Sequence, residues 1–259
     1  MTKCIVKKSE LSSYLCGFGP GVDDLRLDVK DNGLVGGVAL STHFLTKRIT
    51  VDQKEAGPVV IADLAKTIAF LKACSGDEVE LQQTHVKGKG AANLRIICGN
   101  STINLPPTQE IKSSAALEMA TKLVNEAGET NWESFGNATL TAYGIIDVND
   151  LRQVASLGKV VGQDKPYKFT LVGEQSNAVI HTGTAVSGQM FHKFGLTDVD
   201  VSGDDDIVSS TYGPWFPDVL SCLPLGKVEM YTGDSTVLIL NHQDKDCLLV
   251  VIDQDADDE

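Results

Sequence analysis

The chain has 259 residues, of which 42% are hydrophobic and 22% are charged, and its formal net charge is -13. This composition is typical of a folded globular protein and excludes a disordered or collagen-like chain. An excess of 35 acidic over 22 basic residues also argues against a simple basic DNA-binding module.

The negative charge is unevenly distributed along the chain. Residues 1–106 carry 13 Lys and Arg against 11 Asp and Glu, whereas residues 107–259 carry 9 against 24. The first part is therefore nearly neutral, and almost all of the excess lies in the second part. An average charge does not describe what each part offers to a partner.

Short strands dominate the predicted elements of the first half. Runs rich in Val, Ile, Leu, Phe or Thr, bounded by Gly, Asn, Asp or Pro, predict strands. The sequence Asp31-Asn32-Gly33 predicts a tight hairpin turn between two of them. The predicted strands cover residues 25–29, 34–40, 48–52, 79–83, 93–98 and 101–105.

Two helices are predicted in the same half. Residues 61–74 place Leu64, Ile68 and Leu71 on one face at helical spacing, with Asp63 as a start signal. Residues 7–15 predict a shorter helix that faces the core with two leucines.

The second half repeats this pattern. Helices are predicted over 147–157, with Asp147 or Asn149 as the cap, and over 214–223, which begins with a proline. The predicted strands cover residues 139–143, 168–172, 178–182, 195–201, 228–231, 237–241 and 247–252.

The two halves have the same order of elements: a helix, several strands, a second helix and a three-strand meander. Between them, a segment that opens with Pro106-Pro107 reads as a connector and contains a helix-like patch over 117–124. We therefore predict two similar domains, 1–106 and 138–259, joined by a connector at 107–137. The second domain ends in an acidic tail.

This repeat resembles the sliding DNA clamps, the ring family that includes proliferating cell nuclear antigen and the phage clamps. Three stretches carry the resemblance: Ala39-Leu40-Ser41-Thr42-His43-Phe44-Leu45, residues 58–81, and residues 210–255. It implies an α+β fold of two similar domains, each with two helices against curved antiparallel sheets. It also implies a closed ring of three subunits around duplex DNA.

The resemblance further implies two functional surfaces. Basic residues on the helices would face DNA and hold it through weak phosphate contacts that permit sliding. These candidates are Lys7, Lys8, Lys66, Lys72, Arg152 and Lys159. A hydrophobic pocket would bind short peptide tails of replication proteins. Its candidates are Leu40, His43, Thr236, Val237, Val251 and Ile252.

Catalytic and metal-binding patterns are absent from the sequence. The six cysteines and five histidines show no metal-ligand spacing, and no nucleophile motif occurs. We therefore expect a non-enzymatic protein without a cofactor or metal. No run of residues is apolar and long enough to span a membrane, and no secretory signal is present, so we expect an intracellular protein in the cytoplasm, the nucleoid or a nucleus.

The leading hypothesis is a homotrimeric processivity factor whose partners are double-stranded DNA, a DNA polymerase and a clamp loader. Two alternatives share the repeat. One is a β-rich structural or assembly protein, for example of a virus, and the other is a monomeric, clamp-like DNA-binding processivity factor.

Overall fold

The computed structural model describes residues 1–19, 21–86, 90–106, 134–135, 138–161, 165–184, 186, 188–202, 206–234 and 236–253. These residues form two compact units. Unit 1 lies within Met1–Ala39 and Leu45–Leu123, and unit 2 lies within Leu40–Phe44 and Val124–Glu259. The predicted connector is described only at 134–135, and the acidic tail only at Asp253. The helix-like patch at 117–124 lies outside the described residues.

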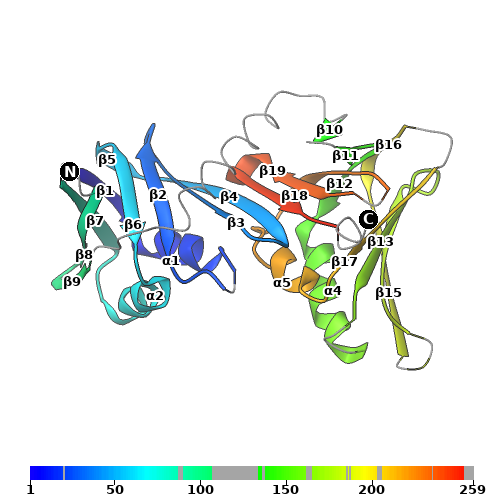
Figure 1. Ribbon diagram of the computed structural model, residues 1–259, viewed down its shortest axis with the longest axis horizontal. Helices are drawn as coiled ribbons and strands as arrows, with labels where there is room; N and C mark the ends of the chain where they lie inside the picture. Colours follow the sequence, from blue (N-terminus) through cyan, green and yellow to red (C-terminus); the bar gives the residue numbers. More distant parts are fainter. Residues whose placement is uncertain are drawn as a thin grey trace. The chain divides into compact units, whose positions relative to one another are not determined.

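Unit 1 consists of antiparallel strands and two helices (Figure 1). One of its sheets has the order β5-β1-β7-β8-β9, and β2 pairs with both β3 and β6. The elements are β1 (Thr2–Lys7), α1 (Lys8–Cys16), β2 (Leu25–Lys30), β3 (Gly33–Ala39), β4 (His43–Thr50), β5 (Asp52–Glu55), β6 (Gly57–Ile61), α2 (Leu64–Ala73), β7 (Glu78–Val86), β8 (Gly90–Cys98) and β9 (Ser101–Leu105).

Unit 2 likewise consists of antiparallel strands and helices. Its sheets have the orders β16-β12-β18-β19-β20 and β15-β14-β13-β17, and a short hairpin joins β10 (Ser134–Phe135) to β11 (Ala138–Thr139). The other elements are β12 (Ala142–Asp147), α4 (Val148–Val161), β13 (Tyr167–Val172), β14 (Asn177–Thr184), β15 (Gly188–Gly195), β16 (Thr197–Val201), β17 (Ile207–Tyr212), α5 (Phe216–Leu220), β18 (Lys227–Thr232), β19 (Leu238–His242), the 3-10 turn η1 (Gln243–Lys245) and β20 (Cys247–Val251).

The order of elements repeats between the units. From β1 to β9 and again from β12 to β20, the chain forms a strand, a helix, five strands, a helix and three strands. The strand pairing repeats as well, since β5-β1-β7-β8-β9 corresponds to β16-β12-β18-β19-β20. Few helices against antiparallel sheets confirm the predicted α+β class.

The predicted turn at Asp31-Asn32-Gly33 is confirmed. Asp31 and Asn32 have φ angles of 51° and 54°, as required by the two central residues of a type I′ hairpin turn. Arg48 donates a hydrogen bond from Nη2 to the main-chain oxygen of Asp31 at 2.8 Å, which holds the turn against β4. The turn fixes the register of β2 against β3, in which Lys30 lies opposite Gly33.

The helices lie where the periodicity predicts them, with different ends. The helix predicted from residue 61 begins at Leu64 because the preceding residues pair with β2 as β6. Its start signal is confirmed, since the Asp63 carboxylate accepts a hydrogen bond from the main-chain N–H of Lys66 at 2.7 Å. Helix α4 extends beyond its predicted end to Val161, and α5 is restricted to Phe216–Leu220.

Five of the described strands have no predicted counterpart: β1, β6, β10, β15 and β17. The first, β1, alternates buried Thr2, Cys4 and Val6 with more exposed residues, but its two flanking lysines disguise the pattern. Strand β15 has Gln189, His192 and Lys193 among its apolar residues, and β17 has serine and threonine at its centre, so neither reads as an apolar run. The strand predicted over 195–201 is divided between the end of β15 and β16.

In unit 2, two carboxylates bind the edge strand β17. The main-chain N–H of Ser209 donates to Asp234 Oδ1 at 2.7 Å, and that of Thr211 donates to Asp253 Oδ2 at 3.1 Å. Asp253 is 2% exposed, so its carboxylate is part of the packed structure. Within the described parts of the chain, no helix is long and apolar enough to cross a membrane.

Candidate functional site

A cluster of buried and half-buried apolar side chains lies on one face of the β18-β19-β20 meander of unit 2. The half-buried side chains of Phe44, Tyr231 and Val237 pack against four buried residues. We call this cluster the apolar patch; its buried members are Leu140, Ile239, Leu248 and Val250.

Alternation along β20 decides which residues belong to the patch. Successive side chains of a strand point to opposite faces, so Leu248 and Val250 share one face while Leu249 and Val251 share the other. Val251 is 0% exposed and therefore belongs to the interior of unit 2. Val251 thus lies on the face of β20 opposite to its neighbour Val250, which lies in the patch, and its contact with a partner peptide stays a prediction.

The other predicted pocket residues lie in or beside the patch. Val237 is a patch residue, and Thr236 precedes it in the chain and is half-buried. Leu40 is 37% exposed, and Ile252 donates its main-chain N–H to the oxygen of Thr42 at 3.0 Å. This bond joins the segment that contains Leu40 to the end of β20.

His43 is a buried, neutral histidine. Its side chain is 4% exposed, its Nδ1 lies 3.0 Å from Thr42 Oγ1, and its Nε2 has no hydrogen-bond partner among the described residues. Burial lowers the pKa of His43 to about 4. At neutral pH the imidazole is therefore uncharged, and it contributes to an apolar surface without adding a cation.

The sequence prediction missed six patch residues: Phe44, Leu140, Tyr231, Ile239, Leu248 and Val250. The continuous run Cys247–Val251 indicated a strand buried on both faces, but it could not show which alternate residues face the patch. Only the register of β20 against β19, with Ile239 opposite Val250, fixes that choice.

The basic residues predicted to face DNA divide into two kinds in unit 1, where α1 and α2 lie side by side (Figure 1). Lys66 and Lys72 are exposed on α2, Lys66 in an ion pair with Asp63 at 3.4 Å. Lys7 is likewise exposed and pairs with Glu10 at 3.5 Å. Lys8 instead donates from Nζ to the main-chain oxygen of Cys74 at 2.8 Å, at the end of α2.

In unit 2 the predicted basic surface is smaller. Arg152 on α4 donates from Nη2 to the main-chain oxygens of Ser221, at 3.2 Å, and of Leu223. Its guanidinium therefore binds main-chain oxygens that follow the end of α5. The side chain of Lys159 lies outside the described residues. Helix α5 itself carries Asp218 and no Lys or Arg.

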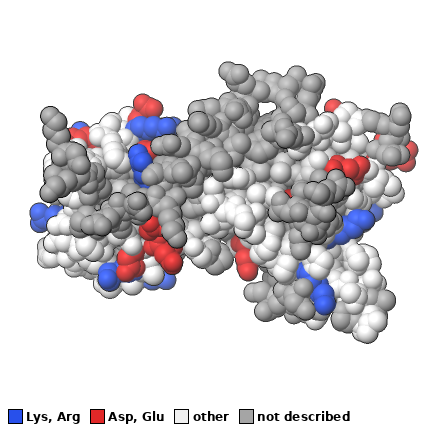
Figure 2. Space-filling view, in the orientation of Figure 1, with Lys and Arg blue, Asp and Glu red and all other residues white. Residues whose placement is uncertain are grey.

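Basic and acidic side chains are interspersed on the molecular surface. On the face shown in Figure 2, the described Lys and Arg residues do not gather into one continuous patch. Surface charge of this kind gives weak, salt-sensitive attraction to phosphate groups and no tight grip.

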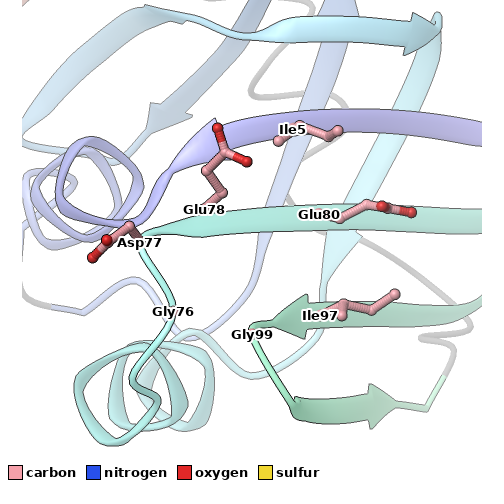
Figure 3. Close-up of a pocket in the computed structure, with 7 residues that line it drawn as sticks. All are labelled: Ile5, Gly76, Asp77, Glu78, Glu80, Ile97 and Gly99. Atoms are coloured by element: carbon pink, nitrogen blue, oxygen red, sulfur yellow. The ribbon is translucent and has the colours of Figure 1, made fainter.

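Unit 1 also has an acidic groove of about 560 Å³ on the outer side of β1, β7 and β8 (Figure 3). Its lining consists of Ile5, Gly76, Asp77, Glu78, Glu80, Ile97 and Gly99. The hydrogen bond from Lys3, together with one from Gln82, lowers the pKa of Glu80, whose carboxylate lies 2.8 Å from Lys3 Nζ. No sequence pattern predicts this groove, and its carboxylates would repel DNA.

Metal chemistry finds no support in the described part of the chain. There, no group of three or more His, Cys, Asp or Glu side chains is arranged to hold a metal ion. The apolar patch and the exposed basic residues are therefore the surfaces that remain as candidates.

A scan against protein-family models and a search of curated proteins both find nothing that matches the chain. Solved structures, in contrast, include many that are similar to this chain in fold. A putative DNA polymerase III beta subunit from Eubacterium rectale is similar over 97% of this chain and 65% of its own, with a TM-score of 0.70 and 10% sequence identity. The Helicobacter pylori beta clamp, bound to a DNA ligase peptide, is similar over 98% of this chain and 66% of its own, with a TM-score of 0.67 and 12% identity.

PCNA from A. fulgidus, bound to the C-terminal region of FEN-1, has a TM-score of 0.66 and 12% identity over 98% of this chain and 97% of its own. The chain thus spans about two thirds of the length of the two bacterial proteins and nearly all of this PCNA. At such low identity the similarity establishes the architecture: the chain has the fold of the sliding DNA clamps.

Proposed function

We propose that this protein is a sliding clamp: a non-enzymatic ring of three copies that encircles duplex DNA and tethers a DNA polymerase and other replication proteins to it. A clamp loader would place the ring on DNA. Its place of action would be inside the cell, in the cytoplasm or nucleoid or in a nucleus, wherever DNA is replicated.

The observation that carries this proposal is the similarity in fold and extent to A. fulgidus PCNA. Each chain covers almost the whole of the other, 98% and 97%, so no large part of either chain is left unexplained. The internal repeat supports the same conclusion, because two units with the same order of elements are the subunit architecture that the clamp resemblance implies. Because one fold can have many functions, the proposal also requires surfaces suited to partner proteins, DNA and self-association.

The apolar patch supports the binding of partner proteins. Phe44, Tyr231 and Val237 remain half-buried over a hydrophobic base, and such aromatic and aliphatic surfaces are typical anchors for short peptides. Two of the similar structures contain partner peptides, one from DNA ligase and one from FEN-1. By analogy we propose that the patch is where this chain binds the tails of its partners.

The helices support loose contact with DNA. The four helices α1, α2, α4 and α5 carry five Lys or Arg residues and three Asp or Glu residues. Their small positive excess contrasts with the net charge of -13 for the whole chain. A ring that holds DNA by topology needs no more than weak phosphate contacts, while its acidic remainder discourages binding elsewhere.

The open sheet edges support self-association. Strand β9 ends one sheet of unit 1, and β15 ends one sheet of unit 2. On β15, Phe191 is 64% exposed and stacks on His181 with the ring centroids 4.4 Å apart. An edge strand that is open on one side and carries an exposed aromatic side chain is a natural site for strand addition. We propose that β15 of one copy pairs with β9 of the next.

Loading on circular DNA tests this function. The protein would be loaded onto nicked circular DNA by a clamp loader, separated from free protein and then exposed to a restriction enzyme. A topological ring remains on the circle and leaves the DNA once it is linear. Retention on linear DNA would contradict the proposal and favour a monomeric groove-binding processivity factor.

The mass in solution over a dilution series tests the assembly independently. We expect a trimer that dissociates only at low concentration. A monomer at all concentrations would overturn the ring, and a large assembly without affinity for DNA would favour the structural or assembly protein.

A further inference from the structure

Two cysteines of unit 1 lie together outside the surfaces described above. Cys74 is the residue at the C-terminal end of α2, and Cys98 is the last residue of β8. Both thiols are free, and the side chains are 7% and 1% exposed. The proposed function uses neither of them.

Their side chains are neighbours, and a hydrogen bond with Cys98 is among the causes that raise the pKa of the Cys74 thiol. The Cys98 Sγ also lies 3.5 Å from the main-chain oxygen of Gly76, two residues after Cys74. The Cys74 Sγ lies 3.4 Å from the oxygen of Leu71, so it remains beside the last turn of its own helix. Neighbouring thiols satisfy the first requirement for a disulfide, which is proximity without a large backbone movement.

The backbones approach closely at the same place. A Cβ atom added to Gly76 would lie 2.5 Å from the main-chain nitrogen of Gly99 and 3.0 Å from the carbonyl carbon of Cys98. Two glycines thus let the segment after α2 contact the turn after β8. This contact keeps the two cysteines together as long as unit 1 is folded.

A route for a small reagent exists beside the pair. Gly76 and Gly99 both line the groove of unit 1, Gly76 in the segment between α2 and β7 and Gly99 in the turn between β8 and β9 (Figure 3). They follow Cys74 by two residues and Cys98 by one. A small oxidant that enters the groove therefore reaches the chain segments that follow both cysteines.

We propose that Cys74 and Cys98 form a redox-sensitive pair that closes into an intramolecular disulfide when the protein meets hydrogen peroxide. The Cys74 thiolate attacks one peroxide oxygen, the O–O bond breaks, and a sulfenic acid and hydroxide are formed. The Cys98 thiolate then attacks the sulfenic sulfur and expels the second oxygen, which leaves as water. In total, two thiols and one peroxide give one disulfide and two waters, with two electrons passing from sulfur to oxygen.

Cys74 is assigned the first step because Lys8 Nζ lies 2.8 Å from its main-chain oxygen, and a nearby cation favours the thiolate. Burial and the interaction with Cys98 nevertheless raise the pKa of the Cys74 thiol. The thiolate is the reactive form, so the rate of disulfide formation should rise as the pH increases from 7 to 9. A disulfide here would join the end of α2 to the end of β8, and would lower the entropy of the unfolded chain.

The test uses the full chain carrying Cys16→Ser, because Cys16 is exposed and would react independently. After treatment with peroxide, free thiols are alkylated under denaturing conditions and the digest is analysed without reduction. We expect a linked peptide pair containing Cys74 and Cys98, lighter by about 2 Da than the two reduced peptides together. We also expect a rise of several degrees in Tm that dithiothreitol reverses.

Two matched variants complete the experiment. Cys98→Ser should abolish both the linked peptide and the reversible rise in Tm, and Cys98→Ala repeats the test without a new hydroxyl. Cys222→Ser removes a buried thiol of unit 2 and should leave both results unchanged. Full alkylation of Cys74 and Cys98 after peroxide, under conditions that oxidise Cys16 in the unmodified chain, would overturn the proposal. So would a rate that does not increase with pH.

Discussion

The Nζ atom of Lys8 lies 2.8 Å from the main-chain oxygen of Cys74, so the first residue of α1 binds the C-terminal end of α2. Unit 2 repeats the relationship with different residues, because Arg152 of α4 binds the oxygens of Ser221 and Leu223 after α5. A cation at the end of a helix satisfies carbonyl groups that have no partner within the helix and interacts favourably with the helix dipole. Lys8 and Arg152, both predicted to face DNA, therefore stabilise the ends of helices within their own units.

Replacement of Lys8 by Met should lower stability while keeping the apolar part of the side chain. The loss of one charge-assisted hydrogen bond to a helix end should reduce the free energy of unfolding by about 1 kcal/mol. Urea unfolding measures the change. Lys7→Met is the matched control, since Lys7 is exposed and its pair with Glu10 contributes little. Equal effects of the two substitutions would contradict the capping role.

The double substitution Lys66→Ala and Lys72→Ala should leave stability nearly unchanged and weaken retention on DNA. Both side chains are exposed on α2, so stability should remain within about 0.5 kcal/mol of the original protein. The lifetime on circular DNA should fall, and its dependence on salt concentration should weaken, because fewer phosphates are contacted. Lys30→Ala with Lys54→Ala removes the same charge from strands and serves as the control. A similar loss in the control would mean that overall charge, and not α2, holds DNA.

Substitution in the apolar patch should weaken partner binding without affecting retention on DNA. Phe44→Ala or Val237→Ser removes a half-buried contact, and each should reduce the affinity for a clamp-binding peptide, such as the C-terminal region of FEN-1, about tenfold. Fluorescence anisotropy with a labelled peptide measures the affinity. Val186→Ser changes an apolar side chain that is 99% exposed and should have no effect. Unchanged binding in the patch variants would exclude the patch as the docking surface.

His43 should make stability depend on pH. Its pKa is about 4 in the folded protein and near 6.5 in the unfolded chain, so below pH 6.5 the unfolded state binds more protons. The free energy of unfolding should therefore fall by about 2 kcal/mol between pH 7 and pH 5 from this residue alone. Urea unfolding at both pH values, compared with His43→Asn, isolates the effect. An equal decrease in the variant would assign it to other groups.

Local sequence signals were sufficient for much of the fold. The Asp31-Asn32-Gly33 turn and the Asp63 cap depend on neighbouring residues only, and both are confirmed. The start of α2 depends on tertiary pairing, because β6 uses Ile61, which a helical periodicity alone would include. Strands such as β15 were missed for the same reason: their alternation is set by a partner strand and not by their own composition.

The functional surfaces were predicted less completely. The resemblance named segments that lie in or beside the apolar patch, but which side chains of β20 belong to the patch depends on its register against β19, with Ile239 opposite Val250. Likewise, the charge of Lys8 and Arg152 is visible in the sequence, whereas the carbonyl groups that they bind come from residues 66 to 71 positions away. No local pattern carries that information.

The carboxylates on β17 give the chain a direction of assembly. Alternate residues of an edge strand point their N–H groups outward, and at Ser209 and Thr211 these donors are already bound by Asp234 and Asp253. The β15-β14-β13-β17 sheet can therefore accept a further strand at β15 but not at β17. In the proposed ring, a copy that can be extended at β15 alone would add head to tail and would not broaden into a layer. Growth would end where the rotation between copies brings the last copy to the first.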